Sequence, residues 1–232
     1  FCLSRGLGDV YKRQVLDLNG QYVYYFEALR DAFWGEESIL YNWSRNLSGG
    51  YIGIIGYYLA SPFTLIVMLL PRTMLLGSLQ IMILAKLGTA GVTFSYYLQK
   101  SKKMPPLQTV IFSTLYALCA YGVIQAMNPM WLDGVFLLPL IILGVEYLVD
   151  DGRKLNFIIP LAIMFISNFY IGYIVGIFTF LYFVFYIFSG RNEIGRKFKA
   201  NDYWKTFLRF AGSTGVALLC SAFMIIPVYK AL

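Results

Sequence analysis

The sequence predicts an all-α, polytopic transmembrane helical bundle. Hydrophobic residues make up 59% of the 232-residue chain and charged residues only 13%, and long apolar runs recur along the whole sequence. A helix needs about 20 mostly apolar residues to cross roughly 30 Å of hydrocarbon. A membrane β-barrel would instead show short segments of alternating polarity. We therefore expect about six spans, together with an amphipathic or re-entrant helix in an outer loop.

The expected spans alternate with loops of two kinds. We place the spans at 75–98, 107–126, 135–149, 155–168, 171–188 and 207–227. Lys and Arg occur in the loops 99–106, 150–155 and 189–205 and are absent from 127–134 and 168–171. Because basic loops stay on the cytoplasmic side, we expect the second set to face outside. This orientation accounts for the net charge of +7, so we expect no nucleic-acid partner.

The N-terminal part divides into two segments. Residues 1–14 are polar and basic and lack the apolar core of a signal peptide. We interpret 1–14 as non-native readthrough, so that a preceding transmembrane helix is missing. We expect 15–74 to form an extracytoplasmic loop with amphipathic helices and 75–232 to form an incomplete transmembrane bundle.

Within this loop, the apolar spacing of three and four residues predicts a helix over 21–33 that ends at Gly35. The apolar run 51–70 contains glycines and a Ser61-Pro62 pair, which disfavour a straight span. If 51–70 crossed the membrane, 17–44 would be cytoplasmic. We favour an interfacial or re-entrant helix, which keeps 17–74 on the outer face.

Candidate catalytic residues are concentrated in 17–44, which holds five of the twelve carboxylates. Asp17, one helical turn before Gln21 and Tyr22, can act as a general base or a metal ligand. Its spacing also fits a helix N-cap or a solvated loop, and spacing alone favours that interpretation. Glu36 has an adjacent carboxylate and can share a metal with it, although a polar turn explains the pair more simply.

The absence of His excludes Ser–His catalysis and any His-ligated metal site. Three Cys, at 2, 119 and 220, indicate no disulfide framework. A metal would have to be held by carboxylates, which favour a hard ion such as Mg²⁺ or Mn²⁺. We therefore expect Mg²⁺ or Mn²⁺, with Asp17 as a ligand, or no cofactor.

Lys86 lies about eleven residues into the first expected span, near mid-membrane. A charge at that depth is costly and indicates a function. Lys86 can bind the phosphate of a lipid substrate, or pair with a carboxylate of another span. Snorkelling explains it poorly, because at ~1.5 Å per residue the ammonium lies too deep.

The expected outer loops carry the remaining candidates. Trp131 and Asp133 place an indole and a carboxylate close together in one outer loop. The pair can be an interface anchor, as Trp often is at this depth, or can face the Asp17 loop in a functional role, and the sequence favours neither. Asn168 and Tyr170 can hydrogen-bond a sugar or can be interfacial belt residues. We expect Glu146, near a cytoplasmic end, to be solvated.

Six short motifs follow one another along the chain. They are D-x-x-x-Q-Y (17–22), G-E-x-S-x-L-Y-x-W (35–43), Y-Y-L-x-S-P-F (57–63), K-x-G-x-A-G (86–91), M-W-L-D (130–133) and S-N-F-Y-I-G-Y (167–173). Each motif is short, but their order is specific. From about Asp17 to its end, the chain resembles the bacterial YfhO membrane-protein family, whose members are much longer, so we expect it to be a fragment.

This resemblance implies a GT-C-like glycosyltransferase. Such enzymes of the bacterial plasma membrane move a sugar from a polyprenyl-phosphate donor at the outer leaflet, here to a cell-envelope polymer such as teichoic acid. Asp17 occupies the position of the catalytic base or metal ligand. The expected substrate-binding residues are Gln21, Tyr22, Glu36, Lys86, Trp131, Asp133, Asn168 and Tyr170.

The alternative is a transporter or flippase for lipid-linked sugars, which Lys86 and the glycine-rich stretch 86–91 would suit. A transporter would place further polar groups at mid-depth. An enzyme concentrates its acidic residues outside the bilayer, as in 17–44.

Overall fold

The computed structural model describes residues 21–35, 38, 41–42, 49–190 and 200–231. The helices are α2 (Val23–Phe33), α3 (Ile52–Ile54), the π-helix η2 (Ile55–Leu59), α4 (Thr64–Leu69), η3 (Arg72–Met74), α5 (Leu75–Ser101), α6 (Pro106–Ala117), α7 (Ala120–Ile124), η4 (Gln125–Met127), η5 (Pro129–Trp131), α8 (Leu132–Asp150), α9 (Leu155–Ser167), α10 (Phe169–Phe185), η6 (Tyr186–Gly190) and α11 (Ala200–Ala231). Two short strands, β1 (Tyr41–Asn42) and β2 (Gly49–Gly50), pair antiparallel. The expected all-α bundle is confirmed.

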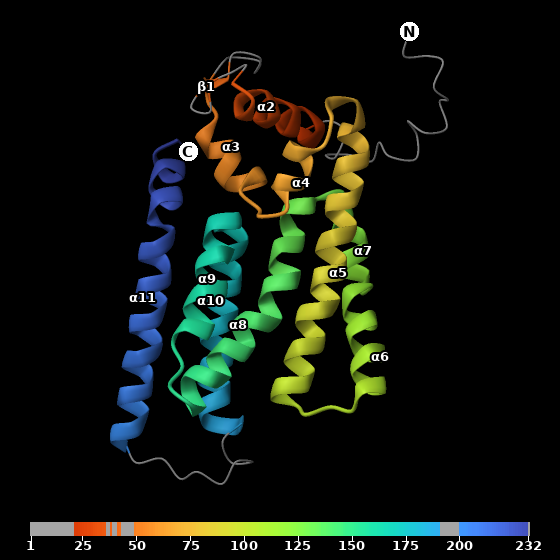
Figure 1. Ribbon diagram of the computed structural model, residues 1–232. Coiled ribbons are helices and arrows are strands. Elements are labelled where there is room, and N and C mark those ends of the chain that lie inside the picture. The colour runs from red at the N-terminus through yellow and green to blue at the C-terminus, as the bar shows by residue number, and fades with distance from the viewer. Residues whose placement is uncertain (1–20, 36–37, 39–40, 43–48, 191–199, 232) are drawn as a thin grey trace.

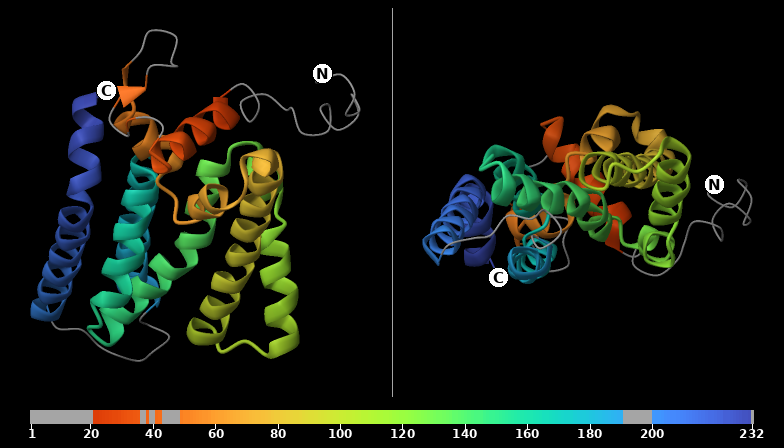
Figure 2. Two further views of the ribbon diagram at one scale, coloured as in Figure 1. Left: turned by 45° about the horizontal axis from the view of Figure 1, so that its top comes forward. Right: turned by 90° about the horizontal axis from the view of Figure 1, so that it is seen from below.

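The long helices α5 to α11 run side by side, and α2, α3 and α4 lie across one end of this bundle (Figures 1 and 2). The basic loops after α5 and α8 lie at the opposite end (Figure 1). The turn around 128 and the break at Asn168 lie at the end that carries α2 to α4, which we call the capped end. The described loops of the two sets, 99–106 and 150–155 on one side and 127–134 and 168–171 on the other, are therefore at opposite ends. Which end faces outside stays a prediction.

Among the described residues, four helical stretches are long and apolar enough to cross a membrane: Leu75–Ser101, Pro129–Asp150, Phe169–Phe188 and Asp202–Lys230. A fifth is formed if Pro106–Ala117 and Ala120–Met127, bent by 41°, are one span. The expected number of about six was slightly too high. The difference is α9, whose 13 residues extend only about 20 Å at 1.5 Å per residue.

The bend after α6 has a local cause. Cys119 has an extended backbone (φ −61°, ψ 157°), which interrupts the helix, and its Sγ accepts a hydrogen bond from the Gly122 amide at the start of α7. An added Cβ at Gly122 would lie 2.9 Å from the Ala117 carbonyl oxygen. The sequence run 107–126 looked uninterrupted because neither Cys nor Gly is a strong break signal in a membrane helix.

Helix α8 is the centre of the bundle. It is buried on nearly every side, and its side chains Ile141, Val145 and Leu148 are almost fully inaccessible. A helix that is apolar all round is expected at such a position. Gly144 allows α9 to approach closely, because an added Cβ would lie 2.5 Å from the backbone oxygen of Asn156. The packing around α8 therefore fixes the positions of the polar residues at the two ends of this helix.

The segment 51–70 does not form one straight helix. It folds into α3, η2 and α4, with the Ser61-Pro62 turn between the last two. The last turns of α11 pack on it: an added Cβ at Gly56 would overlap Val228. Helix α2, found where a helix was expected, buries Phe26 and Leu29 in a second core with Leu59. Residues 1–14 lie outside the described residues.

Candidate functional site

A buried polar cluster joins the capped end to the bundle. The Lys86 ammonium lies 2.9 Å from Asp133 Oδ1 and donates a hydrogen bond of 2.9 Å to the carbonyl of Pro129. The hydroxyl of Ser61 donates to the same Oδ1 at 2.8 Å. Lys86 and Asp133 are each 1% exposed. A buried charge is tolerable when it is paired and hydrogen-bonded in this way.

Three elements position the cluster. Lys86 comes from α5, Asp133 from the first turn of α8, where the helix dipole favours a carboxylate, and Ser61 from the turn before α4. Helix α5 begins beyond the start of α8 (Figure 1). Lys86 therefore reaches the first turn of α8, at the capped end, and not the middle of the bundle as its position in the sequence suggested.

Two buried polar atoms beside this cluster are left without a hydrogen-bond partner among the described residues. They are Oδ2 of Asp133 and Nε1 of Trp131. Trp131 also packs against the second core, which contains Tyr22 and Met82. A buried polar atom that stays unpaired costs free energy. An acceptor and a donor are therefore available here to a water or a ligand.

Asn168 makes a second connection between the bundle and the capped end. Its Oδ1 accepts a hydrogen bond of 2.9 Å from the Ile171 amide, which caps α10, and its Nδ2 donates to the carbonyl of Tyr57 at 2.8 Å. Tyr170 is half-exposed, and its ring centroid lies 6.0 Å from that of Tyr57. Burial, and next Tyr170, raise the pKa of Tyr57, so its phenol is neutral at physiological pH.

Tyrosine rings cluster between α2 and η2. Tyr58 makes an edge-to-face contact with Tyr22 at 5.4 Å and a tilted contact with Tyr25 at 5.2 Å, both between ring centroids. The hydroxyl of Tyr51 donates to the Tyr25 carbonyl at 2.5 Å. Gln21, at the start of the helix, is exposed. This arrangement holds α2 against the helices that follow it.

The sequence of this bundle matches a known family along nearly its whole length. The model of the bacterial membrane protein YfhO family matches residues 12–232. This chain belongs to the YfhO family. With its four or five candidate spans it is a multi-pass membrane protein.

The chain is also similar to a protein of Bacillus subtilis (strain 168) named "Uncharacterized protein YfhO", with 26% identity over 165 residues. The match covers 64% of this chain and 19% of that protein. The chain thus spans about a fifth of the curated relative's length. No solved structure matches it.

The structure of this YfhO-family chain brings together some of the residues expected to form a site. Lys86 and Asp133 form the buried pair, with Trp131 beside them. Asn168 and Tyr170 lie around Tyr57. Asp17 and Glu36 fall outside the described residues, so their catalytic, binding and metal-ligand roles stay predictions.

No group of three or more Cys, Asp or Glu that could hold a metal occurs among the described residues. Lys86 pairs with one carboxylate, that of Asp133, and Tyr97 and Tyr182 share one, that of Glu146. The described part of the chain therefore shows no cluster of three such ligands, and the expectation of Mg²⁺ or Mn²⁺ stays a prediction that rests on Asp17.

The sequence interpretation missed several polar partners. The sequence indicated Ser61 only as part of a helix-disfavouring Ser61-Pro62 pair, and neither its hydroxyl nor the Tyr57 carbonyl was predicted to be a hydrogen-bond partner. The expectation that Glu146 is solvated was wrong: it is 6% exposed and accepts hydrogen bonds from Tyr182 at 2.7 Å and from Tyr97 at 3.3 Å. The burial of Glu146 could have been predicted, because it lies in a helix that is otherwise apolar on all sides and such a helix is buried.

Proposed function

We propose that this chain is part of a membrane glycosyltransferase that moves a sugar from a polyprenyl-phosphate donor to a cell-envelope polymer of the teichoic-acid kind at the outer leaflet. The observation that carries the proposal is membership of the YfhO family, together with the resemblance of that family to GT-C enzymes.

The distribution of polar groups supports this proposal. The buried pair of Lys86 and Asp133, the orphan atoms beside it and the amide of Asn168 all lie at the capped end. A lipid-linked sugar has its tail in hydrocarbon and its head at the interface. Such a substrate would meet polar residues at the end of the bundle, below or beside the helices α2 to α4.

In the proposed reaction, Asp17 removes the proton from an acceptor hydroxyl as the oxygen attacks the anomeric carbon. The bond from that carbon to the phosphate oxygen breaks, the configuration inverts, and polyprenyl phosphate leaves with the electron pair. The leaving phosphate needs a cation. Arg45, a basic residue of the expected outer loop that lies outside the described residues, would supply it. If Asp17 is instead a metal ligand, the bound metal would neutralise the departing charge.

Lys86 has a different role in this proposal. Its ammonium is already engaged by Asp133 and by the Pro129 carbonyl. Binding a phosphate would require it to leave a buried carboxylate uncompensated, which is costly. We therefore assign Lys86 to positioning: it fixes the first turn of α8, and through Ser61 it fixes the turn before α4.

The alternative, a transporter or flippase for lipid-linked sugars, has one observation in its favour. Glu146 is a carboxylate buried inside the bundle between Tyr97 and Tyr182, and buried ionisable groups in spans often mark transport pathways. Against it, Lys86 is held at the capped end.

The test uses the full-length gene in its native host. Asp17→Asn should remove a sugar substituent from the envelope polymers, measured by mass spectrometry at unchanged protein level. Asp151→Asn is the matched control, because it makes the same chemical change in an exposed residue of a basic loop, and it should leave the profile unchanged. An unaltered profile for Asp17→Asn would refute the assignment of the base and favour the transporter.

A further inference from the structure

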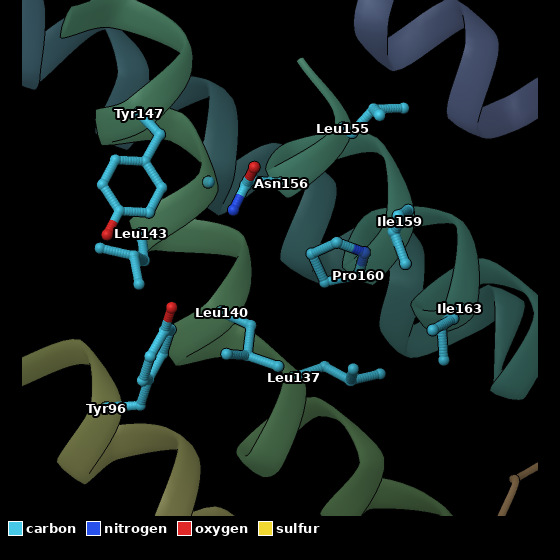
Figure 3. A pocket seen from close by; sticks show the side chains of 11 residues that line it. Tyr96, Leu137, Leu140, Leu143, Tyr147, Leu155, Asn156, Ile159, Pro160 and Ile163 are labelled. Carbon is cyan, nitrogen blue, oxygen red and sulfur yellow. The ribbon is translucent and has the colours of Figure 1, made fainter. Parts of the chain in front are cut away.

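An apolar groove of about 280 Å³ lies between α5, α8 and α9, toward the end with the basic loops. Its walls include Leu137 and Leu140 of α8 and Ile159 and Ile163 of α9 (Figure 3). Gly144 and Asn156, where α8 and α9 approach closely, also line it. The groove therefore presents apolar side chains and backbone over much of its length.

Two cations stand over the aromatic rings that line this groove. The Lys100 ammonium lies 5.8 Å from the ring centroid of Tyr96, and the Arg153 guanidinium lies 5.3 Å from that of Tyr147. Both tyrosines line the groove. Arg153 also makes an exposed ion pair with Asp151 at 3.3 Å. The groove is thus flanked by one cation on the α5 side and one after α8.

The two loops near this groove carry a net positive charge, the same sign as Lys100 and Arg153. Residues 99–106 and 150–155 together contain five basic and two acidic side chains. The hydroxyls of Tyr96 and Tyr147 point toward one another across the groove (Figure 3), and neither makes a hydrogen bond to a described residue. They are available to oxygen atoms of a ligand that lies between the two cations.

We propose that this groove binds one acyl chain of an anionic phospholipid, with the phosphate between Lys100 and Arg153. The apolar wall from Leu155 to Ile163 is about 12 Å long at 1.5 Å per residue, which suits part of a lipid tail. The volume of about 280 Å³ lies just below the range of roughly 300–1,000 Å³ for ligand pockets, so it accommodates part of one chain. Clusters of basic residues at the end of membrane helices attract anionic lipids.

The inference is independent of the proposed sugar transfer, because it concerns the opposite end of the bundle and its test needs no enzymatic activity. The full-length protein is reconstituted in nanodiscs with a photoactivatable phosphatidylglycerol or with the matching phosphatidylcholine. Each carries the reactive group in an acyl chain, and labelled peptides are identified by mass spectrometry. We expect phosphatidylglycerol to label peptides of α8 and α9 in preference to phosphatidylcholine.

Two double variants test the role of charge. Lys100→Gln with Arg153→Gln should lower this preference about 30-fold, which is ~2 kcal/mol at about 1 kcal/mol per basic residue near an anionic surface. Lys102→Gln with Lys103→Gln removes the same charge from exposed side chains that do not line the groove. Because neither lysine stands over a ring that lines the groove, this control should lower the preference clearly less than the first double variant does.

A third variant tests the groove itself. Ile159→Trp fills the apolar wall and should abolish labelling of α8 and α9 by either lipid. The proposal would be overturned by equal labelling with the two lipids in the unaltered protein. It would also be overturned if both double variants had the same effect, or if neither lipid labelled the groove.

Discussion

Replacing Lys86 by Met would test whether the buried ion pair holds the capped end on the bundle. The change keeps an unbranched side chain, one heavy atom shorter, and removes its charge. Asp133 then loses the ammonium at 2.9 Å and keeps the Ser61 hydroxyl as its one hydrogen-bond donor among the described side chains. Removing one partner of a buried pair costs about 3–5 kcal/mol, because the other charge stays buried and uncompensated.

The double variant Lys86→Met with Asp133→Leu separates the pair from simple loss of volume. It removes both charges, so the large penalty disappears. The Pro129 carbonyl and the Ser61 hydroxyl still lose their partners, which leaves a cost of about 1–3 kcal/mol. The double variant should therefore be more stable than Lys86→Met alone by about 2 kcal/mol.

Amide hydrogen exchange in the full-length protein would measure the loss of local stability at the capped end. Peptides covering 51–64 report the opening of the capped end, because Ser61 connects that segment to the pair. A cost of 3 kcal/mol or more corresponds to exchange about 100-fold faster, at 1.36 kcal/mol per factor of ten. Unchanged exchange in Lys86→Met, or faster exchange in the double variant than in the single one, would refute the reasoning.

Three further substitutions test other contacts. Ser61→Ala removes a hydrogen bond to a carboxylate, worth about 1.5–3 kcal/mol, and should speed exchange in 51–64; Ser78→Ala, which removes a buried bond within one helix, should not. Asn168→Ala loses a helix cap and a long-range hydrogen bond, together about 2 kcal/mol, and should lower the thermal midpoint in detergent. Asn168→Ser keeps a neutral cap acceptor, loses the bond to the Tyr57 carbonyl and should fall between, so equal midpoints for both variants would contradict the assigned bonds. Gly144→Ala places a Cβ 2.5 Å from backbone and should destabilise by about 1–3 kcal/mol; Gly88→Ala, with open space around it, should be neutral or stabilising in the same melt, and the reverse order would contradict the packing.

The sequence predicted the helical bundle and most helix limits well. The expected span 75–98 became α5, Leu75–Ser101, and the expected 155–168 became α9, Leu155–Ser167. Hydrophobic length and local break signals determine such limits, and both are properties of neighbouring residues. The bend at Cys119 was not predicted, because an extended residue inside an apolar run leaves no compositional mark.

The sequence predicted some of the residues of the polar site but not which of them are partners. The sequence singled out Lys86 and Asp133 because charges are costly in apolar surroundings, but it could not pair them. They are 47 positions apart, and their contact depends on how far α5 extends beyond α8. Ser61 and Glu146 were missed for the same reason, since their partners come from other elements.

The sequence by itself determined that this protein is a multi-span helical membrane protein of the YfhO family, with basic loops at one end and an amphipathic segment before the first long span. Composition and periodicity are sufficient for this, because burial in hydrocarbon acts on each segment separately. Only the tertiary structure decided that 51–70 folds as short helices across one end. It also decided that Lys86, Asp133 and Asn168 hold that end in place, because a buried polar group takes whichever partner the packing of the helices brings within reach.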